Sequence, residues 1–246
     1  MTLTATFDYA RTISSHLRAM RSAVELVAFE PREASEELVY SMLLWEAPRQ
    51  KADAAMKRLM ASVIDINELR VTREEQISAV LGKTYPHSVQ RSARLTASLH
   101  ELFLREHAVS LESCLAMSKR DARQYLETLE GMPPFVAARV VLVCMGAHAI
   151  PVDQRLTDAL IAVDVLEQGC DIAKATGLLE RHIQSGDGLD AHTLFQAWVD
   201  AGGRPLRGKG GTRGSRGGST TKKASKSTTT SGKTRRKAAS KSTTSR

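Results

Sequence analysis

Cysteine is scarce in this chain of 246 residues: the three cysteines stand far apart, at positions 114, 144 and 170. No CxxC pair is present and no histidines lie at metal-ligand spacing, so the sequence offers no metal site and no disulfide framework. Long apolar runs are also missing, because no segment approaches the roughly 18 apolar residues of a membrane span, and the first ten residues do not read as a signal peptide. We expect a cytoplasmic protein with reduced thiols, no metal and no membrane contact.

Acidic residues are missing from residues 204–246, although this segment holds 14 of the 35 lysines and arginines. Glycine, serine, threonine and alanine fill most of the remainder, and Leu206 is its one large apolar residue. Such a segment buries too little apolar surface to offset its chain entropy, so we expect a disordered basic tail. The other 203 residues keep 21 basic residues against 27 acidic ones, a net charge of −6, and the basic excess therefore lies entirely in the tail.

A flexible tail with a charge of +14 should bind polyanions through counterion release, with an affinity that falls as the salt concentration rises. It would hold the protein on DNA without sequence preference and so associate it with the nucleoid. A tail that serves only solubility is the alternative. The expected non-specific DNA contacts are Lys222, Lys223, Lys226, Lys233, Arg235, Arg236 and Lys237.

Strand-like alternation is absent as well, whereas apolar residues recur at helical spacing from about residue 8 to residue 201. The sequence therefore predicts an all-α fold, with an N-terminal helix in residues 1–30 and a helical domain over residues 31–203. Thr72 and Glu75 predict a capping box, and Asp153 stands where it would begin a helix. The main predicted helices are 9–29, 34–46, 51–63, 72–81, 88–106, 134–145, 172–183 and 190–201.

The most informative stretch is LEGMPPFVAARVVL at residues 129–142, followed by IPVDQRL at residues 150–156. A helix, a tight turn containing Gly131 and a second helix that starts at Pro134 form a helix-hairpin-helix. Backbone N–H groups at the start of the second helix have no helical partner, and the helix dipole there favours an anion such as a DNA phosphate. An ordinary helix C-cap is the alternative role for Gly131.

These two stretches resemble the endonuclease III superfamily of helix-hairpin-helix DNA glycosylases, and the resemblance extends more weakly over roughly residues 30–200. It implies a bilobal helical fold with duplex DNA in the cleft between the lobes and a flipped nucleotide held for chemistry. Asp153 matches the acid that stabilises the sugar's developing charge or activates water, although a structural N-cap is its alternative role. The DNA-binding residues implied by the hairpin match are Gly131, Met132, Pro133, Pro134, Phe135, Val136 and Ala137.

Several departures from the family pattern limit the chemistry. Phe135 occupies the position of the Schiff-base lysine, so a lyase step from that position is excluded and hydrolysis remains. Pro133 replaces the second hairpin glycine and removes one backbone donor. No cysteine follows Cys170, so the family's iron–sulfur cluster is not expected and the protein should need no cofactor. Ala47 stands where relatives carry a glutamine that fills the gap left by the flipped base.

Three hypotheses follow from these observations. The first is a monomeric, monofunctional DNA glycosylase of base-excision repair that binds damaged or abasic double-stranded DNA, with Asp153 as its catalytic residue. The second is a catalytically inactive helical DNA-binding protein whose tail makes the contacts. The third is a helical protein-interaction module whose tail binds RNA. The net negative charge of residues 1–203 disfavours a glycosylase that works without the tail.

Overall fold

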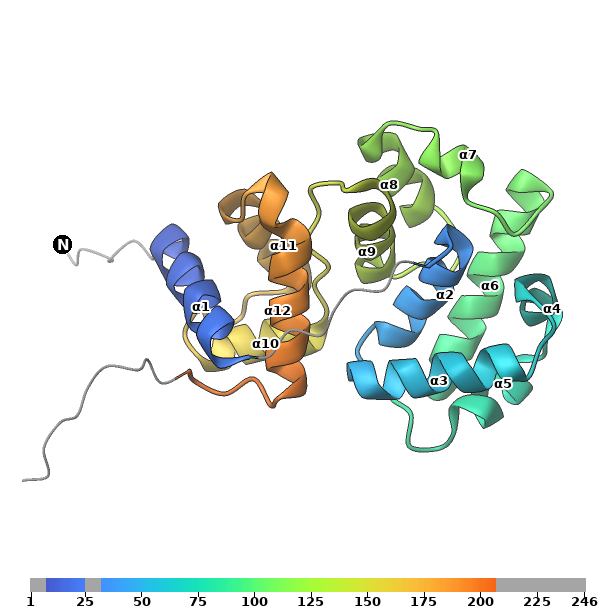
Figure 1. The fold of residues 1–246 in the computed structure, drawn as a ribbon, viewed down its shortest axis with the longest axis horizontal. Helices are drawn as coiled ribbons and strands as arrows, with labels where there is room; N and C mark the ends of the chain where they lie inside the picture. The colour runs from blue at the N-terminus through green and yellow to red at the C-terminus, as the bar shows by residue number, and fades with distance from the viewer. Residues whose placement is uncertain (1–7, 25–31, 207–246) are drawn as a thin grey trace, which may run out of the picture. The chain divides into compact units, whose positions relative to one another are not determined.

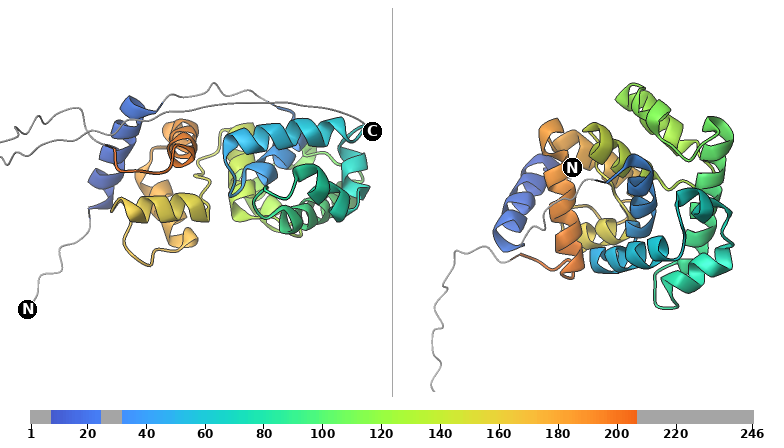
Figure 2. Two further views of the ribbon diagram at one scale, coloured as in Figure 1. Left: turned by 90° about the horizontal axis from the view of Figure 1, so that it is seen from below. Right: turned by 45° about the vertical axis from the view of Figure 1, so that its right-hand side comes forward.

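The computed structural model describes residues 8–24 and 32–206, and in these residues it contains helices and no strand (Figures 1 and 2), which confirms the predicted all-α class. The elements are α1 (Tyr9–Ala23), α2 (Ala34–Leu44), α3 (Arg49–Ala61), α4 (Ile66–Val71), α5 (Glu74–Leu81), α6 (Ser88–Glu106), α7 (Glu112–Leu115), α8 (Lys119–Glu127), α9 (Pro134–Met145), α10 (Gln154–Ala162), α11 (Ile172–His182), the short 3-10 helix η1 (Ser185–Asp187) and α12 (Gly188–Asp200).

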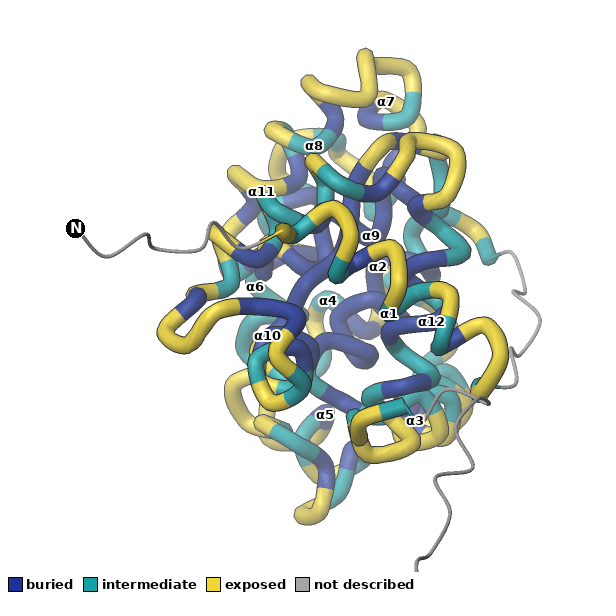
Figure 3. The backbone as a smooth tube through the Cα atoms, turned by 90° about the vertical axis from the view of Figure 1, so that its left-hand side faces the viewer, coloured by how far each residue is buried: buried dark blue, intermediate teal, exposed yellow. Residues whose placement is uncertain are grey.

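Helices α2 to α9 surround a first hydrophobic core. α6 contributes Leu95, Leu99 and Leu102, which recur every three or four residues and are fully buried. α2 and α9 are buried on nearly every side, and Figure 3 shows buried residues along the inner sides of the helices with exposed residues at the outer turns. This core therefore carries the helix-hairpin-helix formed by α8 and α9.

The first and the last described helices build the second hydrophobic core together. Ile13 and Met20 of α1 are buried together with apolar residues of α10, α11 and α12, among them Leu179 and Trp198. Residues 146–153, which connect α9 to α10, lead from the first core to the second. α1 thus packs against α11 and α12, the last α-helices of the described chain, although α2 follows it in sequence.

Polar contacts join the two cores. Asp153 at the start of α10 accepts a hydrogen bond from the Glu46 N–H, which lies just after α2, at 3.0 Å. In α12, Asp200 accepts from the Arg49 N–H at 2.8 Å, and the Gln196 side chain donates to the Ala47 carbonyl at 3.3 Å. The residues that follow α2 are therefore held between the cores, beside the start of α10.

α2 ends in an unusual way because buried side chains satisfy its last carbonyl groups. The guanidinium of Arg91, which is fully buried, donates to the carbonyls of Met42, Leu43 and Trp45, and the Tyr85 hydroxyl donates to the Leu43 carbonyl at 2.6 Å. These donors replace the helical partners that the last turn lacks. They fix the position of the loop that follows α2.

The structure corrects one expectation and leaves another partly untested. Thr72 and Glu75 form no capping box: Thr72 ends α4, and its hydroxyl donates to the Glu68 carbonyl at 2.8 Å. Because the Thr72 hydroxyl bonds to a carbonyl one turn earlier in the chain, it stands at the end of α4 and does not cap α5. Helix 9–29 is confirmed as far as Ala23, where α1 ends, and residues 25–31 lie outside the described residues.

Candidate active site

The hairpin between α8 and α9 has the geometry that its sequence requires. Pro134 opens α9 at a position where the missing N–H has no helical role. Gly131 has a φ of +74°, and a Cβ added there would lie 3.1 Å from the Cα and carbonyl oxygen of Arg94 on α6. A side chain at this position would be strained, and its Cβ would press against backbone that must give by a few tenths of an ångström. The close approach of hairpin and α6 therefore depends on this glycine.

Several backbone donors remain open at this turn. The N–H groups of Met132, Val136 and Ala137 donate to carbonyls within the hairpin, at 3.1, 2.9 and 3.2 Å. The N–H groups of Glu130, Gly131 and Phe135 have no acceptor among the described residues. Free backbone donors next to a helix N-terminus suit an anion.

Burial limits the part that the predicted hairpin residues play. The side chains of Met132, Pro133, Phe135, Val136 and Ala137 are buried; in contrast, Pro134 is exposed and Gly131 is half-buried. The buried side chains pack the hairpin onto the first core. A ligand at this turn would therefore meet backbone N–H groups, together with the ring of Pro134.

Asp153 is the N-cap of α10, and its side chain is nearly fully buried, with 4% exposed. One carboxylate oxygen accepts from the Leu156 N–H at 2.9 Å and the other from the Glu46 N–H at 3.0 Å. Burial raises the pKa of Asp153 above its ordinary value, while these two hydrogen bonds act in the opposite direction. The carboxylate thus caps a helix and also joins the two cores.

A cavity of about 10 Å³ lies beside Asp153 and is lined on other sides by Phe135, His192 and Gln196. This volume corresponds to about one water molecule, given that roughly 10–15 Å³ of accessible space is needed to hold one. Phe135 contacts His192 edge-on, with ring centroids 6.0 Å apart. The residue at the lysine position therefore forms an apolar wall next to the carboxylate.

A wider cleft of about 570 Å³ adjoins the hairpin, and the sequence did not point to most of the residues that line it. The hairpin contributes Pro133, Pro134 and Phe135 to the lining, and α11 contributes Ile172, Ala173, Thr176, Gly177 and Glu180. Trp45 and Glu46 form part of the lining because of how α2 ends, which depends on tertiary contacts and leaves no mark in the local sequence.

Charged and aromatic groups meet at the rim of this cleft. Glu46 accepts from His87 Nε2 at 2.9 Å, and the His87 ring stacks on Trp45 with centroids 6.1 Å apart. The guanidinium carbon of Arg94 lies over the same indole, 5.0 Å from its ring centroid, and Arg123 pairs with Glu180 at 2.7 Å. Arg94 and Arg123 are the two arginines among the described residues that line the cleft.

The remaining predicted contacts, Lys222 to Lys237 of the basic tail, lie outside the described residues. Among the residues that are described, no three histidine, cysteine or acidic side chains are placed to hold a metal ion. No helix in the same residues is long and apolar enough to cross a bilayer.

Comparisons with known proteins identify the fold. No protein-family model matches the chain, and no curated protein matches its sequence. Among solved structures, a trapped endonuclease III–DNA covalent intermediate is similar, with a TM-score of 0.60 at 17% identity over 80% of this chain and 86% of that chain. A thermostable thymine-DNA glycosylase is similar with a TM-score of 0.57 at 14% identity, over 78% and 86% of the two chains.

A third similar structure is the Helicobacter pylori 3-methyladenine DNA glycosylase bound to 1,N6-ethenoadenine, with a TM-score of 0.57 at 11% identity over 79% of this chain and 98% of that chain. At such identities the likeness concerns the fold. It confirms that the chain has the helix-hairpin-helix fold of these DNA glycosylases, as the motif at residues 129–156 implies.

Proposed function

Starting from a fold shared with DNA glycosylases, we propose that this protein binds double-stranded DNA and hydrolyses the N-glycosidic bond of a damaged base in base-excision repair. The observation that carries the proposal is the position of Phe135. Its backbone N–H is one of the free hairpin donors, and the residue lines both the cleft and the cavity at Asp153. A phosphate held by the hairpin would therefore bring a nucleotide next to the carboxylate.

Asp153 would act through its charge. The transition state of base release resembles an oxocarbenium ion, and a carboxylate fixed in a low-dielectric setting stabilises such a cation more strongly than one in water. The cavity beside it has room for about one water molecule. The oxygen of that water would bond to the sugar carbon as the bond to the base breaks, and the water's proton would pass to the departing base. With Phe135 in place of a lysine, no Schiff base forms there, so the product is an abasic site in an intact strand.

Release of bases from duplex oligonucleotides, each carrying one lesion, tests this function. Abasic products are converted to breaks by hot alkali, and the same reactions without alkali report any lyase activity. The expected result is alkali-dependent cleavage for at least one lesion, abolished in Asp153→Asn without loss of DNA affinity. Absence of cleavage for every lesion would refute a glycosylase activity.

A second candidate is a DNA-binding protein without catalysis, and the hydrogen bonding of Asp153 favours it. Both carboxylate oxygens are occupied by backbone donors, and only 4% of the residue is exposed. Competition between a duplex with an abasic-site analogue and the same duplex intact separates the candidates. A preference for the abasic duplex supports a cleft that holds a flipped nucleotide, and equal binding supports the second candidate.

A further inference from the structure

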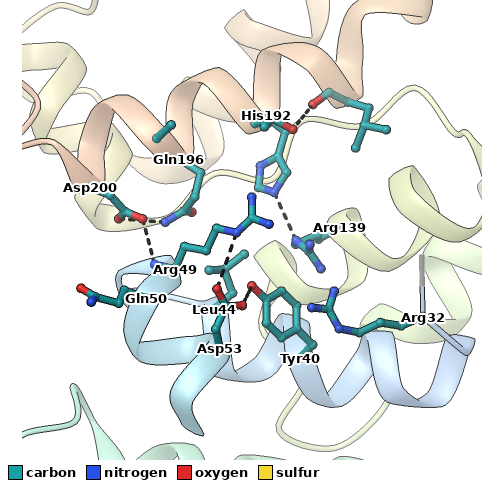
Figure 4. Close-up of a pocket in the computed structure, with 13 residues that line it drawn as sticks. Arg32, Tyr40, Leu44, Arg49, Gln50, Asp53, Arg139, His192, Gln196 and Asp200 are labelled. Atoms are coloured by element: carbon teal, nitrogen blue, oxygen red, sulfur yellow. Dashed lines mark hydrogen bonds and ion pairs between the residues drawn. The ribbon is translucent and has the colours of Figure 1, made fainter. Parts of the chain in front are cut away.

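A separate cavity of about 310 Å³ lies between α2, α3, α9 and α12 (Figure 4). Its volume is at the lower end of the range for small-molecule sites, roughly 300 Å³ and above. His192 and Gln196 line both this cavity and the small one beside Asp153, so the two are neighbours. A group that entered here would lie next to the proposed reaction centre.

Arg139 of α9 places a guanidinium group on the wall of this cavity, although only 4% of the residue is exposed. Its Nη1 donates to a carboxylate oxygen of Glu37 and to Ser41 Oγ, and its Nε donates to His192 Nε2 at 3.2 Å. Burial and the neighbouring Arg139 lower the pKa of His192 well below its ordinary value, so the ring is neutral and can accept this bond.

The remaining amino group of Arg139, Nη2, has no hydrogen-bond partner among the described residues. The side-chain atoms that are both fully buried and without a hydrogen bond lie elsewhere: His16 Nε2, Glu37 Oε2 and Arg70 Nε. Nη2 is therefore accessible from the cavity. A charged donor that has no protein partner and faces the cavity can donate to an acceptor on a ligand.

Other groups on the wall define what kind of ligand fits. Both amide hydrogens of Gln196 are used, one toward the Ala47 carbonyl at 3.3 Å and one toward Asp200 at 3.0 Å, which leaves its oxygen as an acceptor. Two guanidinium groups lie over the Tyr40 ring, with the carbon of Arg32 at 3.8 Å and that of Arg139 at 5.1 Å from its centroid. Glu37 balances the charge of Arg139, and the other charged residues of the wall are two arginines and two aspartates, so the wall suits a neutral ligand with an acceptor and a donor: Arg32, Arg49, Asp53 and Asp200.

We propose that this cavity binds a nucleobase with an exocyclic carbonyl group next to a ring N–H, with the carbonyl oxygen on Arg139 Nη2. An amino group at the same position would direct hydrogens at a donor and would leave both groups unpaired. The inference rests on the proposed function for the origin of the base but does not require catalysis. It names the class of base that the protein prefers.

Hypoxanthine and adenine test this preference, because at ring position 6 hypoxanthine carries a carbonyl group and adenine an amino group. Binding of each free base to the full-length protein is measured by calorimetry. One hydrogen bond to a charged donor corresponds to a preference for hypoxanthine on the order of 10- to 100-fold. Equal affinities, or no binding of either base at millimolar concentration, would overturn the proposal.

The double variant Arg139→Met/Glu37→Gln removes the donor without leaving a buried carboxylate unpaired. It should lower the affinity for hypoxanthine to that for adenine, with a native thermal melt. Should it fail to fold, Gln196→Leu on the half-buried wall replaces it and should weaken hypoxanthine binding on its own. Arg18→Met, at an exposed position on α1, is the matched control and should change neither affinity. An unchanged preference in a folded Arg139 or Gln196 variant contradicts the proposal.

The two proposals fail in different ways. Hypoxanthine binding without base release from any oligonucleotide would contradict the glycosylase activity and leave the cavity assignment intact. Base release from amino and carbonyl substrates at equal rates, together with equal binding of the two free bases, would leave the activity and overturn the cavity assignment.

Discussion

Replacement of Asp153 by alanine should destabilise the protein more than the loss of an ordinary helix cap. The variant removes the acceptor of the Leu156 N–H, which corresponds to about 1 kcal/mol for an N-cap. It also leaves the partly buried Glu46 N–H without an acceptor, which adds about 1–2 kcal/mol. The free energy of unfolding should fall by about 2–3 kcal/mol in total.

Urea unfolding of the full-length protein measures this change. With a denaturant dependence of about 2 kcal/mol per molar urea, the unfolding midpoint should move down by about 1–1.5 M. Asp171→Ala is the matched control, because Asp171 caps α11 by accepting from the Lys174 N–H at 2.7 Å but is exposed and makes no bond to the other core. Its midpoint should move by about half as much.

The comparison of the two alanine variants tests the reasoning directly. If Asp153→Ala destabilises no more than Asp171→Ala, the Glu46 bond contributes nothing to stability. The assignment of Asp153 as the link between the two cores would then be wrong.

Three further predictions concern pH, the hairpin and the tail. Burial lowers the pKa of His192, so the contribution of the neutral ring to stability is present above about pH 6.5 and is lost as the pH falls. The variant His192→Gln keeps an acceptor for Arg139 and should lose less stability than the unmodified protein between pH 7 and pH 5, measured by thermal melts. An equal loss in the two proteins would contradict this. Gly131→Ala should lower the free energy of unfolding by about 1–3 kcal/mol. Gly146→Ala is the control, because Gly146 has a φ of +57° but open space around it, and it should lower the free energy of unfolding by about 1 kcal/mol. Equal losses would show that the close approach of the hairpin to α6 does not affect stability. Glutamine at the seven basic positions from 222 to 237 should flatten the salt dependence of DNA affinity, measured by fluorescence anisotropy, and an unchanged slope would exclude tail contacts.

Much of the fold could be predicted from the sequence because its helices are long and clearly bounded. α6 and α9 begin and end where the apolar spacing and the flanking Gly and Pro residues predict, and Asp153 is the N-cap that its position implied. α4 and α7 were missed, because helices of six and four residues are too short to show a helical period. The capping box failed because Thr72 bonds backward to α4.

The site could be predicted only where its chemistry is local. Gly131 and the open donors beside it follow from the hairpin motif alone. The bond from the Glu46 N–H to Asp153 spans 107 residues, and the one from Arg139 to Glu37 spans 102. Such pairs depend on which helices become neighbours, and a single sequence carries no signal for them.

The position of α1 has a consequence for how the chain acquires its structure during synthesis. Residues 32–149 supply every helix of the first core, so that core can form while later residues are still being added. α1 leaves the ribosome earlier, yet the partners that bury Ile13 and Met20, among them Leu179 and Trp198, come more than 150 residues later. Until then the apolar face of α1 has no partner to pack against, so it is exposed to chaperones on the nascent chain.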